Sequence, residues 1–228
     1  WAADYYWVGG SGKWSEIEHW RTTSGGTSSP SVIPGPTDNV FFDAKSGFTT
    51  SSKTVMLDNT ANCHNIIFAG SAVAPTLTQS GSQTLNIYGS SEWQTGMGIV
   101  DVSTIFYRHT GEAKTIKSNG VKTGNYALYF EEENSLSLLD NFYASAIYFY
   151  HNAGTWNTNN FRVDISRAFF KNTSKASILN LGSSQIYLLH AYSEFNTSPS
   201  TTTVNAGTSH FHFPAISEGN GLIANATQ

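Results

Sequence analysis

Cysteine and charge are what this chain has least of. Its 228 residues include a single cysteine, Cys63, so no disulfide can form within the chain. No basic group except His64 adjoins it, and we expect Cys63 to be a small buried hydrophobic residue, not a reactive thiol. Only 12% of the residues are charged, the net charge is −4, and lysine and arginine form no cluster. This balance argues against a nucleic acid or an anionic membrane as partner.

Long apolar runs and helical periodicity are missing too. No segment approaches the ~20 apolar residues of a membrane-spanning helix. No segment carries a sustained apolar stripe at i, i+3, i+4 and i+7, the pattern of an amphipathic helix. The sequence therefore predicts an all-β protein that does not span a membrane. Because it begins at Trp1 and ends without an obvious stop pattern, we expect the chain to be part of a longer protein.

What the chain does contain is a short apolar and aromatic motif that recurs at intervals of 18 to 25 residues. It occurs at 66–68, 86–88, 105–107, 128–130, 147–149, 168–170, 186–188 and 211–213. A second strand-like run often precedes the motif, and Gly, Ser and Asn lie between the two. Recurrence in this range is typical of stacked supersecondary units, each supplying two or three short strands.

This organisation predicts a right-handed parallel β-helix, in which each coil lies in register on the next at a spacing of ~4.8 Å. The handedness follows from the general preference of parallel crossovers. A β-sandwich or barrel is the alternative, but hairpins favour more Asn-Gly turns than the two found, Asn119–Gly120 and Asn220–Gly221. The recurrence starts after residue 60, so we expect coils of about 20 residues over 61–228 and a separate cap over 1–60, in one continuous domain.

The expected cap is rich in tryptophan, with four of the six (Trp1, Trp7, Trp14 and Trp20) in the first twenty residues. The end of a solenoid exposes unpaired strand edges and a cross-section of its core, and large aromatic rings cover such an end well. The residues expected to build the cap are Trp7, Gly9, Gly10, Trp14, Trp20, Asp38, Phe41 and Phe42. A phosphate loop at 9–12 is not expected, because Lys13 is followed by Trp14 and no helix pattern follows.

The same segment resembles the start of modules in very large bacterial surface proteins. It is similar to autotransporter-associated β-strand repeats, and more closely to Bacteroidetes adhesins of the gliding-motility type. The matching residues are Trp7, Gly9, Gly10, Gly12, Trp14, Trp20, Pro34, Asp38, Asn39, Val40, Phe41, Phe42 and Asp43. The resemblance covers about the first quarter of the chain. It implies export to the bacterial cell surface, often by a type 9 or type 5 secretion route, a structural or adhesive role, and no catalytic residues.

Several carboxylates are catalytic candidates, because β-helices host polysaccharide lyases and glycoside hydrolases. They are Asp101, Glu131, Glu132, Glu133, Asp140 and Asp164. Placed on the recurrence, the three aspartates do not form one column. Asp101 and Asp164 fall on coils ~14 Å apart, whereas paired catalytic carboxylates are ~5–9.5 Å apart. The three consecutive glutamates are expected to form a solvated corner. We therefore expect no enzyme and no cofactor.

The histidines are candidate metal ligands. His210 and His212 share one face of an expected strand, but no third ligand lies nearby in the sequence. His109, His151 and His190 are expected at equivalent corners of coils ~10 Å apart, too far for one metal ion. No metal site is expected.

Aromatic residues in the irregular segments are the remaining candidates for function. Trp93, Trp156, Tyr143 and Tyr150 are expected either to fill coil corners or to form flat platforms for sugar rings. The leading hypothesis is a non-enzymatic, rigid β-helical stalk or adhesin module at the cell surface. Its expected partners are surface glycans or other cell-surface and secretion components. The alternatives are a carbohydrate-binding module and a glycan lyase or hydrolase.

Overall fold

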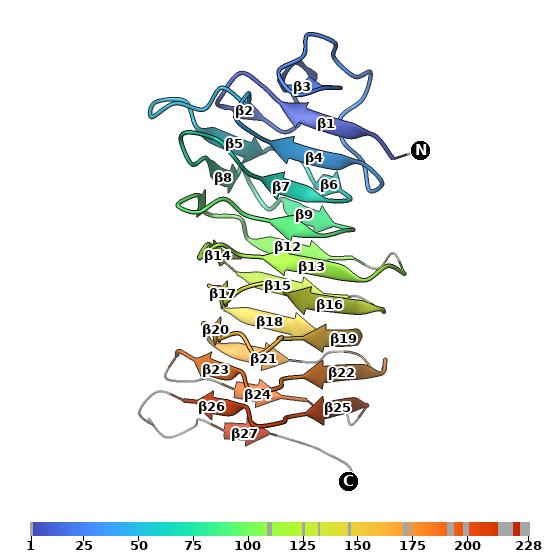
Figure 1. Cartoon of the computed structure of the whole chain (residues 1–228), viewed down its shortest axis with the longest axis vertical. Helices are drawn as coiled ribbons and strands as arrows, with labels where there is room; N and C mark the ends of the chain where they lie inside the picture. The colour runs from blue at the N-terminus through green and yellow to red at the C-terminus, as the bar shows by residue number, and fades with distance from the viewer. Residues whose placement is uncertain are drawn as a thin grey trace.

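The chain folds into an elongated stack of β-strands that runs from the amino terminus at the top of Figure 1 to the last coils at the bottom. This computed structural model describes residues 2–108, 111–124, 126–131, 133–145, 147–170, 173, 175–190, 194–197, 201–213 and 221–223. Apart from the short 3-10 helix η1 (Ile17–His19), the described elements are β-strands. The predicted all-β class is confirmed.

The strands form three long faces. The first face is a ten-stranded sheet, made of β1 (Asp4–Trp7), β3 (Trp20–Arg21), β4 (Asn39–Phe42), β7 (Ile66–Phe68), β10 (Ser91–Glu92), β13 (Lys114–Lys117), β16 (Ser135–Leu138), β19 (Gly154–Asn157), β22 (Ser177–Asn180) and β25 (Thr202–Asn205). The second face is an eight-stranded sheet, made of β6 (Ala61–Cys63), β9 (Thr84–Ile87), β12 (Thr104–Tyr107), β15 (Ala127–Phe130), β18 (Tyr148–His151), β21 (Ala168–Phe170), β24 (Glu194–Asn196) and β27 (Gly221–Ile223).

The third face consists of two shorter sheets, a four-stranded one towards the amino terminus and a five-stranded one in the later coils. The four-stranded sheet contains β2 (Gly12–Lys13), β5 (Thr54–Leu57), β8 (Thr76–Gln79) and β11 (Gly98–Ile99). The five-stranded sheet contains β14 (Lys122–Thr123), β17 (Phe142–Ala144), β20 (Val163–Ile165), β23 (Gln185–Leu188) and β26 (His210–His212).

Each coil gives one strand to each face and then returns to the first. After β7, β8 and β9, for example, β10 pairs in parallel with β7. The pairing is parallel between successive coils, as in β12 with β9 and β15. The predicted parallel β-helix is confirmed, with three strands in a full coil.

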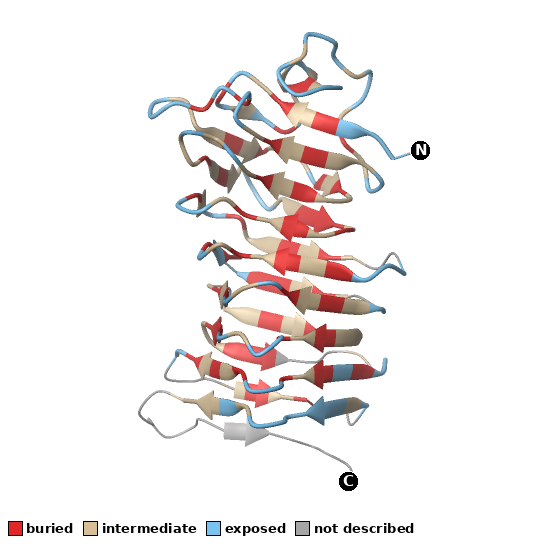
Figure 2. Ribbon diagram, in the orientation of Figure 1, coloured by how far each residue is buried: buried red, intermediate tan, exposed pale blue. Residues whose placement is uncertain are grey.

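Alternation of side chains along each strand builds the core. In β5, β12, β16 and β23 every second residue is buried and the residues between are partly exposed. Figure 2 shows this alternation down the stack. Since strands pair in register, inward residues form columns, such as Leu85, Ile105, Leu128 and Phe149 in the eight-stranded sheet. Cys63 is fully buried, as expected, and its burial raises the pKa of the thiol.

The recurrent motif does not mark one face throughout. The segments from 86–88 to 168–170 lie on the eight-stranded face, in or at the ends of β9, β12, β15, β18 and β21. The segment at 66–68 is β7 of the ten-stranded sheet, and those at 186–188 and 211–213 lie in the five-stranded sheet. Strands on all three faces have alternating apolar residues. The motif therefore indicates a strand but does not identify the face to which the strand belongs.

The tryptophan-rich cap is a compact aromatic cluster over the first coils. Trp7, Trp14 and Trp20 are fully buried, and the Trp20 ring lies 5.0 Å from each of the other two, at steep interplanar angles. Phe42 lies beneath them and stacks on Phe68 of the next coil, with ring centroids 4.0 Å apart. Trp1 lies outside the described residues. The cluster joins the cap directly to the coil core.

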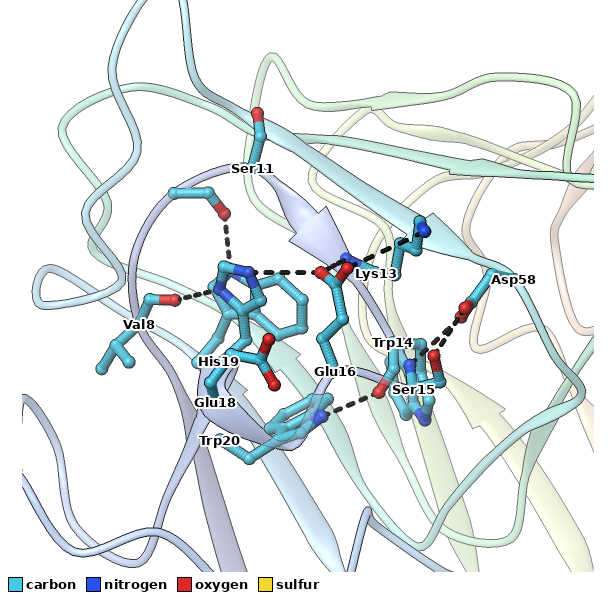
Figure 3. A network of polar contacts seen from close by, with 12 residues as sticks. Val8, Ser11, Lys13, Trp14, Ser15, Glu16, Glu18, His19, Trp20 and Asp58 are labelled. Atoms are coloured by element: carbon cyan, nitrogen blue, oxygen red, sulfur yellow. Dashed lines mark hydrogen bonds and ion pairs between the residues drawn. The ribbon is translucent and has the colours of Figure 1, made fainter.

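Polar contacts fix the cap, as Figure 3 shows. The His19 ring stacks on Trp7 at 4.6 Å, and its Nδ1 lies 2.6 Å from the Val8 carbonyl oxygen. The backbone N–H and hydroxyl of Ser15 donate to the Asp58 carboxylate at 3.1 and 2.5 Å, which links the cap to the turn after β5. These contacts hold the loop of residues 8–19 over the aromatic cluster.

The other expected cap residues shape its turns and its outer surface. Gly9 and Gly10 both have positive φ, 87° and 75°, which side-chain-bearing residues rarely adopt. Asp38 accepts hydrogen bonds from the backbone N–H groups of Ala3 and Gly35, at 3.0 and 2.9 Å. Phe41 faces outward, where it stacks on Tyr6, so it belongs to the surface and not to the buried cluster.

Residue 60 does not coincide with a break in the sheets. β4 pairs in parallel with β1 and with β7, and β5 pairs in parallel with β2 and β8. β3 differs, because it turns back and pairs antiparallel with β1 at the end of the ten-stranded sheet. The exposed edge of the first coil is thereby covered by its own chain, which is the physical task of a cap.

A substitution at Gly12 tests the cap. A Cβ atom there would lie 2.1 Å from Nε2 of His19, whose ring is held by Trp7 and Val8. We expect Gly12→Ala to lower the free energy of unfolding by about 1–3 kcal/mol, measured by denaturant titration. Gly98→Ala is the matched control, because its Cβ would meet no atom closer than 3.5 Å. Equal losses in the two variants would contradict the tight packing of this loop.

Candidate binding surface

Two of the four aromatic residues proposed to contact glycans are in the core. Trp93 is fully buried and stacks on Phe68 at 5.7 Å, and Trp156 is 2% exposed among Phe130, Phe149 and Phe169. Neither side chain offers a face to a sugar ring, so of the two alternatives expected from the sequence, packing in the interior holds for both and surface platforms are wrong. Trp156 lies in strand β19, not in a loop, in register with two buried leucines, Leu136 and Leu179.

Tyr150 is on the surface, but its ring belongs to a stack. It lies on the outer face of the eight-stranded sheet and stacks on Tyr129, which stacks in turn on Phe106, both at 4.5 Å. The Arg108 guanidinium carbon lies 3.9 Å from the centre of the Phe106 ring. A sugar packs on a free ring face. In this ladder Tyr129 of the neighbouring coil covers one face of the Tyr150 ring. The ladder therefore stabilises the contact between coils.

The glutamates after β15 border a hollow of about 410 Å³, at the ends of strands in the eight-stranded sheet. Glu131 pairs with Arg108, and Glu133 pairs with Lys175 at 2.5 Å. Glu132 lies outside the described residues. The two described carboxylates are thus each neutralised by a cation from another coil. They act here as ion pairs between coils, and neither is left as an isolated acid or base.

The aspartates weighed as catalytic groups have separate positions. Asp140 accepts hydrogen bonds from the backbone N–H groups of Ser118 and Asn119, at 2.7 and 2.5 Å. Asn119 has a positive φ of 47°, so this carboxylate holds a turn. Asp101 lies in the turn between β11 and β12, itself with φ 57°. Asp164 lies in β20 of the five-stranded sheet, so the three aspartates do not form one column, as predicted.

The histidines are not gathered at one place. His212 stacks on Tyr187 at 4.2 Å, and its Nε2 lies 2.7 Å from Oε1 of Gln185. His151 points into the core and is 2% exposed, whereas His190 and His210 are exposed. His109 lies outside the described residues. Within the described part of the chain no group of histidine, cysteine and carboxylate side chains is placed to hold a metal ion.

Among the candidate aromatic residues, Tyr143 lines a surface hollow. It lies on β17 in the outward column Lys122, Tyr143, Asp164, Tyr187 and His212, one residue from each strand of the five-stranded sheet. Beside it is a hollow of about 240 Å³, bordered by Lys122, Asp164, Ser145, Ser166 and Leu189. A hollow of this kind, with an aromatic wall and a few polar groups, is the general form of a small-ligand site.

Arg162 organises the rest of this column. Its Nε and Nη2 donate to the two carboxylate oxygens of Asp164 at 2.7 and 2.9 Å, and its guanidinium carbon lies 4.0 Å from the centre of the Tyr187 ring. Hydrogen bonding to Asp164 raises the pKa of Arg162 above its ordinary value. Sequence reasoning missed Lys122, Arg162 and Tyr187. The spacing of Arg162 and Asp164, two residues apart on either side of Val163, could have indicated that they share the outer face of a strand.

Fold and surface together define a parallel β-helix with a paired cap at its amino-terminal end and a small hollow on its third face. Comparisons with protein-family models, curated proteins and solved structures find no match to this chain. Among the described residues no helix has the length and apolar character needed to cross a membrane.

Proposed function

We propose that this chain is a rigid, non-enzymatic structural and adhesive module of a secreted protein at the bacterial cell surface. The observation that carries the proposal is the uninterrupted parallel pairing of the ten-stranded sheet from β1 to β25. A solenoid of this kind presents an extended surface on a stiff core. The resemblance of the first quarter of the chain to gliding-motility adhesins supports the surface location and export by a type 9 route.

Side-chain ladders on the outside add to the stiffness. Asn205 donates from Nδ2 to Oδ1 of Asn180, and Asn180 donates in the same way to Asn157, both at 2.7 Å. Asn157 donates to the Ser137 hydroxyl at 3.0 Å. Each of these bonds joins one coil to the next on the outer face of the ten-stranded sheet. Ladders of this type oppose sliding of one coil over its neighbour.

A glycan lyase or hydrolase is the competing function. Glu131 and Glu133, the acidic groups of the 410 Å³ hollow, are engaged in ion pairs with Arg108 and Lys175, and this supports a binding role over acid–base chemistry. Catalysis on a sugar would require a carboxylate placed to give or take a proton.

The test is an adhesion assay run beside an activity assay. We expect beads coated with the purified chain to adhere to bacterial or host surface polysaccharides. We also expect the soluble chain to release no reducing ends and no unsaturated products from the same panel. Heat-unfolded chain on beads is the control for nonspecific sticking. Product release that scales with protein concentration would overturn the non-enzymatic proposal, and adhesion equal to the control would overturn the adhesive one.

A further inference from the structure

The hollow beside Tyr143 has walls of contrasting chemistry. Tyr143 supplies an aromatic wall, and Leu189, which is 54% exposed, supplies an apolar one. Ser145 and Ser166 also border the hollow, and their side chains are small. The volume, about 240 Å³, suits one sugar ring and not a long apolar molecule. A sugar ring has apolar C–H faces, which match an aromatic wall, and hydroxyl groups at its edge, which match serine hydroxyls.

The charge of the hollow selects among sugars. Lys122 borders it, is exposed, and forms no ion pair among the residues that the structure describes. Asp164 also borders it, but both of its carboxylate oxygens accept hydrogen bonds from Arg162. The three groups together carry one net positive charge, in a chain whose net charge is −4. A ligand with a carboxylate would supply the missing partner of Lys122.

Asp164, which borders the hollow, is held in place before any ligand arrives. Arg162 is fixed by Asp164 on one side and by the face of Tyr187 on the other. Tyr187 stacks in turn on His212, and His212 contacts Gln185. Arg162 directly precedes β20, and the other side chains come from the adjacent strands β20, β23 and β26, which are paired in register. A pre-organised site loses less conformational entropy on binding than a flexible one.

We propose that this hollow binds a hexuronic acid residue of a surface glycan, with the sugar ring against Tyr143 and its carboxylate at Lys122. The inference rests on the proposed adhesive function and gives that function a ligand class. Ser166 lies where a ring hydroxyl would meet it, and its hydroxyl has no hydrogen-bond partner among the described residues.

The test is calorimetric titration of the chain with an oligogalacturonate and with a neutral galactose oligosaccharide of equal length. We expect the wild-type chain to bind the acidic oligosaccharide more tightly. Tyr143→Ala should weaken that binding by about tenfold or more, as for loss of a central aromatic contact. Lys122→Gln should bring the affinity for the acidic ligand close to that for the neutral one. Tyr126→Ala, which removes a 54% exposed tyrosine outside the hollow, is the matched control and should bind as wild type.

Ser166→Leu is a second variant that leaves Tyr143 in place and fills the hollow. It should also abolish binding, while thermal unfolding monitored by circular dichroism shows that each variant is folded. Equal affinity for the two oligosaccharides, unchanged binding in Tyr143→Ala and Ser166→Leu, or no binding by the wild-type chain would each overturn the inference. In those cases adhesion of coated beads to other polysaccharides would leave the adhesive function standing. Cleavage of the oligogalacturonate would instead overturn the non-enzymatic function.

Discussion

Replacing Phe42 by alanine is expected to lower the free energy of unfolding by about 3–5 kcal/mol. The Phe42 ring is 1% exposed and lies where the cap meets the first full coils. Its centroid is 5.6 Å from that of Trp7 and 5.8 Å from that of Trp20, and it stacks on Phe68 at 4.0 Å. Deletion of the ring removes these contacts between the cap and the first coils. The surrounding tryptophans cannot move far enough to fill the cavity that it leaves.

Phe41→Ala provides the control, because Phe41 is the adjacent residue on the same strand. Its ring lies on the outer surface, partly exposed, and stacks on Tyr6 at 4.8 Å. Its loss should cost about 1 kcal/mol. The stabilities of the two variants can be compared by denaturant unfolding. Tryptophan fluorescence is a suitable signal, because Trp7 and Trp20 lie beside Phe42. If Phe41→Ala lowered the free energy of unfolding as much as Phe42→Ala, the result would contradict the conclusion that the buried cluster joins the cap to the coils.

The strand pattern was the part of the fold that the sequence revealed well. Runs such as Leu136–Leu138 and Ile186–Leu188 alternate between buried and partly exposed positions, and the structure places both in strands. The sequence could not assign each strand to a face, because inward positions on all three faces are filled by the same types of apolar residue. The join of cap and coils was also hidden, since β4 and β5 pair in the stack although residues 1–60 lack the recurrent motif.

The candidate site was predicted least well, and the reason is local. Trp93 and Trp156 interrupt the motif, which favoured surface loops, yet both are buried: Trp156 continues an inward column of the ten-stranded sheet, and Trp93 stacks on Phe68. Tyr143 alternates with the buried Phe142 and Ala144, so its outward direction was predictable. Its neighbours in the column, Lys122 and Asp164, come from other coils. Only the register between strands brings them together, and register is not written in any one strand.

Lys114 is the polar residue least expected from its position. It occupies an inward position of the ten-stranded sheet, in register with Leu136, which is in register with Trp156. Lys114 is 1% exposed, and its Nζ donates to the backbone carbonyl of Arg108. Burial lowers the pKa of Lys114 from 10.5 to about 8, because a low-dielectric core disfavours the charged ammonium, and nearby Glu112 opposes this only partly.

This shift predicts a stability that rises with pH. Between pH 8 and 10.5 the unfolded chain keeps the Lys114 proton while the folded chain has lost it. Because the unfolded state binds more protons in this range, the free energy of unfolding increases as the pH rises. Below pH 8 both states are protonated and the folded state bears the full cost of the buried charge. The shift corresponds to about 3 kcal/mol across the window.

A comparison with Lys114→Met isolates the effect. Burial raises the pKa values of Cys63 and Tyr107, whose ordinary values are 9.0 and 10.0, so these groups lower the stability of wild type and variant alike above about pH 9. The difference between the two proteins in denaturant titrations should therefore shift by about 3 kcal/mol in favour of wild type from pH 7 to 10.5. Lys117→Met removes a partly exposed lysine paired with Glu92 and should show no such shift in favour of wild type. A difference between wild type and Lys114→Met that stays constant with pH would mean that Lys114 keeps its charge in the folded core.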